Sequence, residues 1–348
     1  EGIVSLATGV VDEPITYANG KVVRNADGRY RGYTTIRDAI TDSVNVVAVK
    51  TSRMVTLEKC FQSALNFGIS TLTKETDMVE ALPLGGITDG VTNVELTAAF
   101  AAIANGGVYN EPVYYTKILD HDGNVLLEKQ PESHRVIKET TAFLLTSAMQ
   151  DVVTEGTGRV ANFSGMSIAG KTGTTTSTRA SWFVGYTPYY TCAIWGGYDD
   201  NTELESTRFT RVLWRNVMPR VHEGLEDIGF PVPDGITQCT VCSVSGKLAL
   251  EGVCNEVQTE YFAGDDVPTE TCDVHETALI CTVSGKLAGE YCPAEVCRQE
   301  VFVKNSANGE SQMPTEVCDV HTGNGVLADI LQNLQPGGNG TTGQSSGH

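Results

Sequence analysis

Residues 239–321 contain eight of the ten cysteines of the chain and fall into two similar copies. The first copy reads "CSVSGKLALEGVC" and later "PTETCDVH", which ends at His275, and the second reads "CTVSGKLAGEYCPAEVC" and later "MPTEVCDVH", which ends at His321. Units this short bury little apolar surface and usually need a cross-link. The chain therefore combines a larger domain with a small cysteine-rich module. We expect a domain over residues 1–230, the tandem repeats over 231–321 and a flexible Gly/Ser/Thr-rich tail over 322–348.

Two chemistries compete for these cysteines, disulfide bonds and zinc binding. Zinc is suggested by Cys239-x-x-Cys242 and by two Cys-x-x-His pairs, which end at His275 and His321. The second copy does not begin with a Cys-x-x-Cys pair, so the zinc pattern is not reproduced. We therefore predict disulfides, no metal and no cofactor, with a connectivity that the sequence does not reveal. By alignment, the cysteines of the first copy at 242, 254 and 272 correspond to Cys281, to Cys292 or Cys297, and to Cys318.

The charge of the chain is strongly acidic. The 348 residues carry a formal net charge of −19, and the repeats contain fifteen acidic and only four basic side chains. A surface of this kind repels a phosphate backbone, so the sequence predicts no binding of nucleic acid. No apolar run is long enough to span a bilayer, and the short apolar stretch Val326–Leu334 predicts one or two helical turns.

A strand at the edge of a sheet is predicted at residues 167–174. This stretch has few large side chains, and its glycines allow another backbone or a ligand to come close. The aromatic runs 181–186 and 190–198 predict a hairpin behind it. Such an edge offers backbone N–H groups, two hydroxyls and a cation to an extended peptide that ends in a carboxylate; the alternative is a turn with a solvated lysine. Its last four residues are Lys171, Thr172, Gly173 and Thr174.

A serine and an asparagine form the second candidate group. In "TTIRDAITDSVNVVAVK", apolar residues at helical spacing place Ser43 on the same stripe as Ile36 and Val47, so it is expected to face inward. Asn45 follows two residues later, near an expected break in the helix. A simple helix cap is the alternative, because Ser and Asn are common at helix ends.

Helices and strands mix along residues 1–230 without a regular βαβ alternation. Thr92 and Glu95 predict a capping box at the start of a buried helix, and residues 144–153 predict a second amphipathic helix. Residues 114–119 and 125–127 predict a hairpin around "DHDGN". The pattern indicates a mixed α/β (α+β) domain.

The pairing of Ser43-x-Asn45 with a later Lys-Thr-Gly is part of the signature of penicillin-binding proteins and serine β-lactamases. Over about residues 4–225 the chain resembles the C-terminal part of a class A penicillin-binding protein, the bifunctional peptidoglycan synthase of bacteria. The segments that carry the resemblance, in order, are "VVRNADGRYRGYTTIRDAITDSVNVVAVK", "LPLGGITDGVTNVELTAAFAAIANGGVYNEP", "TEGTGRVA" and "AGKTGTTTSTRASWFVGYTPYYTCAIWGGYDD". The resemblance implies an antiparallel sheet flanked by helices, with the site between the sheet edge and a helical subdomain.

The resemblance also implies a D,D-transpeptidase that cross-links peptidoglycan stem peptides ending in D-Ala-D-Ala. A serine forms an acyl-enzyme, which β-lactam antibiotics also form, on the extracytoplasmic face of the bacterial membrane. In this scheme Ser43 relays a proton, Asn45 holds the substrate amide, and Lys171 lowers the hydroxyl pKa and attracts the terminal carboxylate. The backbone N–H of Thr174 would be an oxyanion donor. The implied substrate-binding residues are Thr172, Gly173 and Thr174.

The nucleophile motif of this family, Ser-x-x-Lys, does not occur in the sequence. Its nearest forms, which end at Lys59 and Lys74, begin with threonine and follow Ser43, whereas the family places the nucleophile before Ser-x-Asn. We therefore expect a fragment that begins after its nucleophile and is inactive alone. The membrane anchor and the glycosyltransferase domain would belong to the missing N-terminal part.

Two other functions share these motifs. A serine β-lactamase-like hydrolase would use the same residues and differ in how fast the acyl-enzyme is hydrolysed. A non-catalytic cell-wall-binding protein would rely on the repeats. The aromatic hairpin, the Gly-Thr-Gly at 156–158 and the repeats favour the synthase.

Overall fold

The computed structural model of the chain describes residues 2–304 and 311–323. These residues form two compact units, of which the first contains residues up to 250 together with 254–272, and the second contains 251–253 and the described residues from 273 onward. The predicted domain limits at 230 and 321 stay predictions. The expected helical turns at Val326–Leu334 and the Gly/Ser/Thr-rich tail lie outside the described residues.

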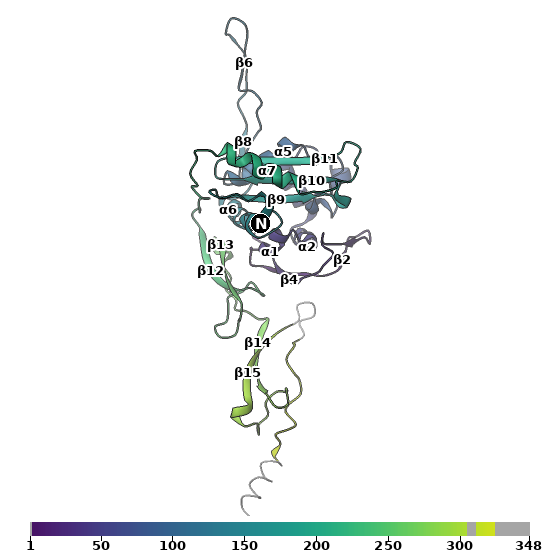
Figure 1. Cartoon of the computed structure of the whole chain (residues 1–348), viewed down its shortest axis with the longest axis vertical. Helices are drawn as coiled ribbons and strands as arrows, with labels where there is room; N and C mark the ends of the chain where they lie inside the picture. The colour runs from purple at the N-terminus through teal and green to yellow at the C-terminus, as the bar shows by residue number, and fades with distance from the viewer. Residues whose placement is uncertain (1, 305–310, 324–348) are drawn as a thin grey trace, which may run out of the picture. The chain divides into compact units, whose positions relative to one another are not determined.

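A three-stranded antiparallel sheet is the centre of the first unit (Figure 1). Its strands are β9 (Ala169–Thr174), β10 (Ala180–Tyr186) and β11 (Thr191–Gly197), in the order β11-β10-β9. Val184 of β10 pairs with Lys171 on one side and with Ala193 on the other. The predicted edge strand and hairpin are therefore confirmed, with β9 at the edge of the sheet.

Helices cover both faces of this sheet because β10 is apolar on both faces. Phe183 points to one face, where its ring packs edge-on against Trp214 with ring centroids 5.3 Å apart. Tyr186 points to the opposite face and packs with Met149 and Phe230. The helices are α5 (Asn93–Ala104) and α6 (Glu139–Thr154), which contact the sheet from one side, and α7 (Phe209–Val221), which contributes Trp214 on the other.

The helix α5 begins as its sequence predicts. The Thr92 side chain accepts a hydrogen bond from the Glu95 backbone N–H, and the Glu95 carboxylate accepts one from the Thr92 backbone N–H. Both groups of a capping box are thus satisfied, which confirms the prediction. The helix ends at Ala104, just before Gly106 and Gly107.

A second group of helices precedes α5 in the chain, and its later members pack around an apolar core of Phe61, Ile69 and Leu72. Two small strand pairs, β1 with β4 and β2 with β3, lie in the same part of the chain. The helices are α1 (Ile36–Asp42), α2 (Asn45–Val55), α3 (Leu57–Asn66) and α4 (Lys74–Asp77), with a 3₁₀ turn at Leu82–Leu84. The strands are β1 (Gly9–Asp12), β2 (Ile15–Thr16), β3 (Val22–Val23) and β4 (Gly32–Thr35).

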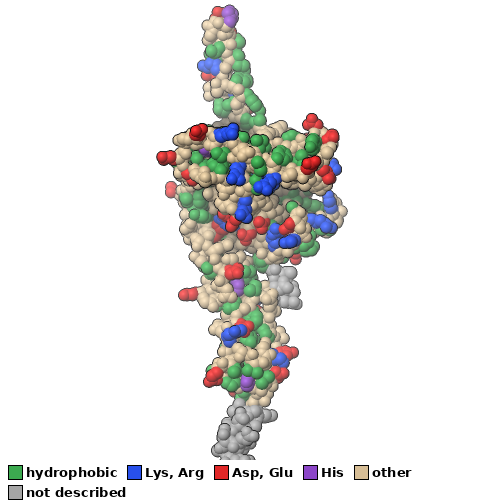
Figure 2. Space-filling model, viewed as in Figure 1, with side chains coloured by type: hydrophobic (Ala, Val, Ile, Leu, Met, Phe, Trp, Pro, Cys, Tyr) green, Lys and Arg blue, Asp and Glu red, His purple; other side chains and the backbone are tan. Residues whose placement is uncertain are grey.

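The predicted hairpin around "DHDGN" is also confirmed. Strands β6 (Lys117–Leu119) and β7 (Val125–Glu128) pair and extend away from the sheet (Figure 1), although β6 begins three residues later than predicted. Apolar side chains are exposed along this hairpin (Figure 2), and Leu126 is 66% exposed. Strands β5 (Val108–Asn110) and β8 (Ser133–Arg135) pair beside it, and a second 3₁₀ turn, Arg159–Ala161, follows α6.

The first cysteine-rich copy packs against α1 and α6 within the first unit. Its strands, β12 (Ile236–Cys242) and β13 (Val257–Ala263), form a two-stranded antiparallel sheet. Val241 and Phe262 are buried together with Ala7. The Tyr261 ring packs edge-on against Phe143 of α6, with ring centroids 5.2 Å apart.

The second copy belongs to the second unit and repeats this arrangement. Strands β14 (His275–Cys281) and β15 (Cys297–Val303) form an antiparallel pair, preceded at β15 by a short 3₁₀ turn, Ala294–Val296. Among the helices that the structure describes, none is both long enough and apolar enough to cross a membrane.

Candidate functional site

Ser43 and Lys171 meet in the structure although 128 residues separate them. The Lys171 ammonium donates a hydrogen bond of 2.7 Å to Ser43 Oγ and one of 3.2 Å to the Thr172 carbonyl oxygen. Lys171 extends from the sheet edge, and Ser43 lies at the end of α1. The two motifs that the sequence singled out therefore form one site.

The position of Ser43 follows from how α1 ends. Ser43 adopts a left-handed conformation, with φ 58° and ψ 51°, and the Val44 backbone N–H donates to the Ala39 carbonyl oxygen at 2.9 Å. A left-handed residue terminates the helix while its last carbonyls remain bonded. A non-glycine residue adopts this conformation only at a cost in free energy, so it is uncommon. The residues that do adopt it cluster at functional sites. The predicted break in the helix is confirmed, and it turns the hydroxyl toward Lys171.

Asn45 begins α2 and lies beside a buried polar network. Its side-chain amide donates to the Arg24 carbonyl oxygen at 2.8 Å. The next backbone N–H, that of Val46, donates to Asn25 Oδ1 at 3.2 Å, and the Asn25 amide donates to both carboxylate oxygens of Asp12 at 2.8 and 2.9 Å. Asp12 is only 1% exposed. Sequence reasoning missed Asp12 and Asn25, because a polar residue shows its burial only when its partners are known.

Lys171 lies in a site that is mostly shielded from water. Burial lowers the pKa of Lys171 from its usual 10.5 to about 8, because a charged ammonium loses hydration there. The lysine is therefore neither the solvated side chain of the alternative interpretation nor a fully neutral amine at pH 7. It provides a positive charge next to a serine hydroxyl.

The segment after α6 reaches the same site and was only partly anticipated. Thr157 Oγ1 lies 2.8 Å from Thr172 Oγ1, and Arg211 donates to the Thr157 carbonyl oxygen at 2.9 Å. A Cβ atom on Gly156 would lie 2.4 Å from the Thr41 carbonyl oxygen, so only glycine fits against the last turn of α1. The sequence signal was "TEGTG", which resembles the family, but its contact with Thr172 depends on the fold.

The glycines of β9 serve close packing inside the sheet. A Cβ atom on Gly170 would lie 2.8 Å from the Phe183 ring and 2.9 Å from the Val184 carbonyl oxygen. The backbone that comes close to Gly170 is thus that of the neighbouring strand. Gly173 lies at the edge next to Trp182, and Thr174, which ends β9, is exposed.

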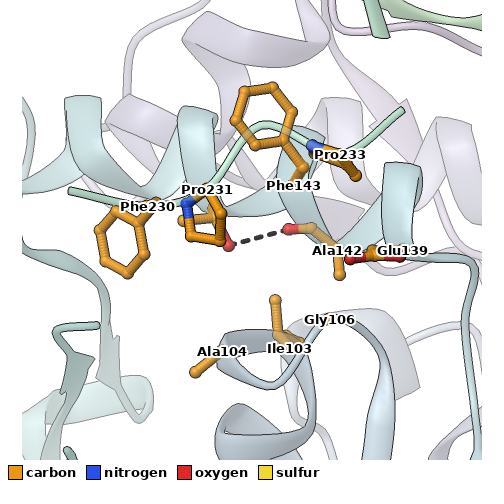
Figure 3. A pocket seen from close by; sticks show the side chains of 10 residues that line it. Ile103, Ala104, Gly106, Glu139, Ala142, Phe143, Phe230, Pro231 and Pro233 are labelled. Carbon is orange, nitrogen blue, oxygen red and sulfur yellow. Dashed lines mark hydrogen bonds between the residues drawn. The ribbon is translucent and has the colours of Figure 1, made fainter. Parts of the chain in front are cut away.

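A small hollow lies elsewhere in the first unit, between α5, α6 and the segment that follows Phe230 (Figure 3). Its walls are mainly apolar, with Phe143, Phe230 and two prolines, and Glu139 is its titratable residue. The Thr146 hydroxyl there donates to the Ala142 carbonyl oxygen at 2.8 Å. None of the predicted site residues lines this hollow, so it is separate from the Ser43–Lys171 site.

Comparison with protein families assigns both parts of the chain. Residues 1–196 match the family described as penicillin binding protein transpeptidase domain. Residues 232–277 and 276–323 each match the family described as penicillin-binding protein 1A, C-terminal domain. The two copies recognised in the sequence are therefore two copies of one known domain.

Individual relatives agree with these matches. Penicillin-binding protein 1A of Clostridium botulinum (strain Langeland) is 33% identical over 86% of this chain, and penicillin-binding protein 1A/1B of Bacillus subtilis is 31% identical over 76%. The chain spans 38% and 31% of the lengths of these two relatives. The crystal structure of penicillin-binding protein 1A from Haemophilus influenzae has the same fold, with a TM-score of 0.68 at 23% identity over 77% of this chain and 46% of that one.

The resemblance inferred from the Ser-x-Asn and Lys-Thr-Gly motifs is thus confirmed, as is the mixed α/β fold class. The family match covers more than half of the chain, and it spans both Ser43 and Lys171. The chain belongs to the penicillin-binding proteins, with a transpeptidase domain followed by two copies of the penicillin-binding protein 1A C-terminal domain.

Proposed function

We propose that this chain carries the substrate-binding and proton-transfer half of a D,D-transpeptidase site that cross-links peptidoglycan stem peptides. The observation that carries the proposal is the 2.7 Å hydrogen bond between Lys171 and Ser43. It joins the two family motifs at the edge of a sheet, and the edge of a sheet is where an extended peptide can pair as a further strand. The family membership supports the reaction class.

The proposed reaction has two steps. A serine hydroxyl attacks the carbonyl carbon of the penultimate D-Ala, an ester forms, and the terminal D-Ala leaves with a proton on its amine. The amine of a neighbouring stem peptide then attacks the ester, an amide forms, and the serine regains its proton. In both steps a proton moves between an amine and an oxygen.

Ser43 is suited to pass that proton. Because the Lys171 ammonium donates to Ser43 Oγ, the hydroxyl proton of Ser43 is left to donate elsewhere, toward the leaving amine. Asn45, two residues later, would hold the substrate amide. Lys171 would also attract the terminal carboxylate, because its positive charge acts at short range in a site of low dielectric constant.

The end of β9 would bind that carboxylate and the reacting carbonyl. Thr172 and Thr174 would donate their hydroxyls to the carboxylate, with Thr157 orienting Thr172 through the 2.8 Å contact between their hydroxyl oxygens. The backbone N–H of Thr174 would stabilise the oxyanion, a contribution of ~10²- to 10³-fold in kcat. Gly173 leaves the strand edge open between them.

We further propose that the acylated serine lies outside these 348 residues, since the sequence holds no Ser-x-x-Lys motif. The complete protein would act on the extracytoplasmic side of the bacterial membrane, where its substrate lies. β-Lactams would acylate the same serine, because their ring carbonyl and carboxylate resemble those of the stem peptide.

The proposal is tested by Lys171→Ala in the complete protein that contains Ser-x-x-Lys. We expect acylation by a fluorescent penicillin to slow by ~10²-fold or more, because the charge that binds the carboxylate is lost. Stopped-flow fluorescence measures the acylation rate, and circular dichroism checks the fold.

Lys50→Ala is the matched control. The Lys50 ammonium lies 2.6 Å from a Glu13 carboxylate oxygen and takes no part in the proposed site. We expect this variant to acylate at the rate of the unmodified protein. Lys171→Ala acylation equal to that of Lys50→Ala would contradict the proposed role. Rapid hydrolysis of the acyl-enzyme would favour a β-lactamase-like function instead.

A further inference from the structure

The cysteines of the second copy gather with a histidine at one end of the β14–β15 sheet. Cys281 is the last residue of β14, and the turn after it is closed by a hydrogen bond from the Gly285 backbone N–H to the Cys281 carbonyl oxygen at 2.8 Å. Leu287 then bridges back to Ile280, and the Cys318 backbone N–H donates to the Leu287 carbonyl oxygen at 2.8 Å. The backbone thus brings Cys281 and Cys318 together across 37 positions of sequence.

Four possible metal ligands converge there. The Nδ1 atom of His321 lies 3.4 Å from the sulfur of Cys281 and 3.5 Å from that of Cys318. With the sulfur of Cys292, these atoms all lie within 4.8 Å of one another. A tetrahedral zinc with bonds of about 2.3 Å to sulfur and 2.0 Å to nitrogen separates two sulfur ligands by about 3.8 Å and a sulfur from a nitrogen ligand by about 3.5 Å. The group already has nearly the size of a zinc site.

Disulfide bonds explain this grouping less well. A disulfide joins only two sulfurs, at about 2.05 Å. A disulfide between two of these three cysteines would therefore give no role to the third cysteine or to the histidine. Among the described residues, which include all ten cysteines, the structure forms no disulfide. The fourth cysteine of this copy, Cys297, lies opposite Cys281 in the ladder but donates to the Pro293 carbonyl oxygen at 3.2 Å.

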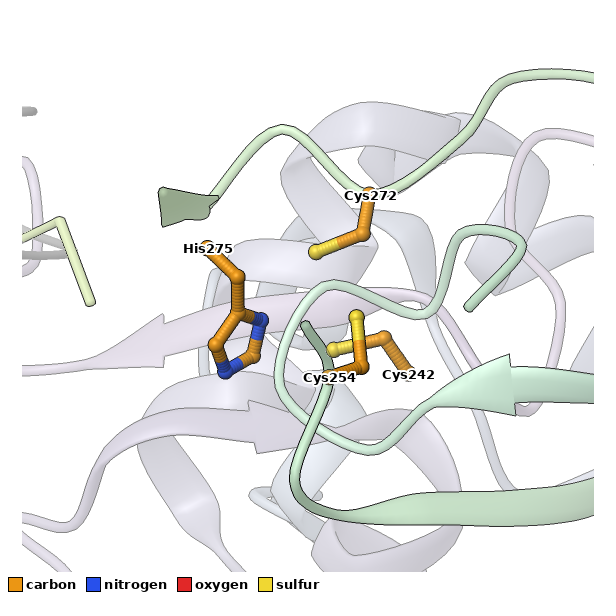
Figure 4. A group of neighbouring side chains, drawn as sticks. All are labelled: Cys242, Cys254, Cys272 and His275. Atoms are coloured by element: carbon orange, nitrogen blue, oxygen red, sulfur yellow. The ribbon is translucent and has the colours of Figure 1, made fainter. Parts of the chain in front are cut away.

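The first copy repeats the three sulfurs but not the fourth cysteine. Figure 4 shows Cys242, Cys254 and Cys272 of the first copy with their sulfurs turned toward one another. The residue opposite Cys242 in its ladder is Val257, so the cross-strand pairing of two cysteines at Cys281 and Cys297 has no counterpart in the first copy. Cys239, which the sequence suggested as half of a Cys-x-x-Cys pair, instead directs its thiol to the Thr240 carbonyl oxygen. The corresponding residues of the first copy are Cys242, Cys254, Cys272 and, by sequence, His275.

Backbone amides support the sulfurs in the same way in both copies. The Gly289 N–H donates to the Cys292 sulfur at 3.3 Å, and the Leu250 N–H donates to the Cys254 sulfur at 3.3 Å. Amide donors of this kind orient thiolate ligands and stabilise their negative charge. A disulfide sulfur is uncharged, so a backbone N–H donor stabilises it much less than it stabilises a thiolate.

We infer that Cys281, Cys292, Cys318 and His321 bind a structural Zn²⁺ ion, and that the first copy binds a second one through the sulfurs of Cys242, Cys254 and Cys272. Three cysteines and one histidine complete a tetrahedral site, which leaves no open position for a substrate. The metal provides the cross-link that a unit this small needs. It also replaces the disulfides that the sequence favoured.

The test is metal analysis of the full chain, purified under reducing conditions without chelator and dialysed against micromolar zinc. We expect two equivalents of zinc per chain by mass spectrometry of the metal, and one equivalent in Cys318→Ser. Replacement of zinc by Co²⁺ should give the absorption of tetrahedral cobalt bound to thiolates, reduced by about half in Cys318→Ser.

Cys297→Ser is the matched control, because it removes a cysteine of the same copy that lies outside the group. It should keep both equivalents. Absence of stoichiometric zinc in the unmodified chain would overturn the inference, whatever the variants do. So would equal zinc contents of Cys318→Ser and the unmodified chain, or loss of one equivalent in Cys297→Ser.

Discussion

At the level of single residues, Lys171 combines a lowered pKa with a hydrogen bond to a serine hydroxyl. Its amine is buried enough to lower the pKa to about 8, yet it stays within 2.7 Å of the Ser43 hydroxyl. A lysine at this pKa keeps its charge at neutral pH but holds its proton less tightly than a solvated lysine. This is the balance that a group needs when it must both attract a carboxylate and support proton transfer by a neighbour.

The lowered pKa predicts opposite pH dependences for activity and stability. Acylation of the complete protein should slow as pH rises through about 8, because Lys171 then loses the charge that we propose attracts the substrate carboxylate. The free energy of unfolding should instead gain a favourable contribution between pH 8 and 10.5, because the unfolded chain binds the proton that the folded chain has released.

Lys171→Arg separates this group from other titrations in the site. Arginine keeps its charge over the whole range, so the loss of acylation assigned to Lys171 should move to higher pH. Stopped-flow rates with a fluorescent penicillin between pH 6 and 10 provide the profile. An identical alkaline limb in the unmodified protein and in Lys171→Arg would show that another group titrates there.

At the level of elements, a buried ion pair fastens the first cysteine-rich copy to the transpeptidase domain. Arg37 of α1 donates two hydrogen bonds of 2.6 Å to the two carboxylate oxygens of Glu260 in β13. It also bonds Ser147 and Asp151, both on α6. Glu260 is only 1% exposed, so the contact with Arg37 is shielded from water. The same helix α1 ends at Ser43, which links this contact to the position of the site.

Removing one partner of this pair should be costly. Glu260→Ala leaves the Arg37 guanidinium buried with only Asp151 as an acidic partner, and we expect the free energy of unfolding to fall by about 3–5 kcal/mol. Urea denaturation followed by circular dichroism measures the change. Glu128→Ala is the control, because its ion pair with Lys117 is exposed, at 51% for Glu128, and should contribute less than ~1 kcal/mol.

The double variant Arg37→Met/Glu260→Leu tests the cause. Without either charge there is no unpaired ion to bury, so its stability should lie closer to that of the unmodified chain than to that of Glu260→Ala. A Glu260→Ala effect no larger than that of Glu128→Ala would mean that the contact does not hold the copy in place.

At the level of the whole molecule, the sequence contains Ser-x-Asn and Lys-Thr-Gly but not the family's nucleophile motif. We predict that these 348 residues alone form no covalent adduct with penicillin. Ser43 is the only serious substitute, but its partner Lys171 would then have to act as the base, and loss of a nucleophile that works as part of a unit costs ~10⁶-fold in kcat. Mass spectrometry of the intact chain after incubation with penicillin tests this, and a stoichiometric adduct on any residue would refute it.

Local patterns were sufficient for much of the fold. The capping box at Thr92, the aromatic hairpin behind β9 and the break after Asp42 follow from backbone rules that act within a few residues. The two cysteine-rich copies could also be recognised from the sequence, because their segments match residue by residue. The family could be named from Ser43-x-Asn45 and Lys171-Thr172-Gly173 because the spacing within each motif is local, even though their pairing is not.

What the sequence alone determined, then, is the family, several of the helices and strands, and the two motifs that contain Ser43 and Lys171. Only the tertiary structure decided which distant groups lie in contact: Arg37 with Glu260, Thr157 with Thr172, and His321 with Cys281. The physical reason is that backbone propensities act over a few residues, whereas electrostatic and metal-ligand contacts act over a few ångströms. Separation along the sequence therefore does not reveal which side chains make these contacts until the backbone has folded.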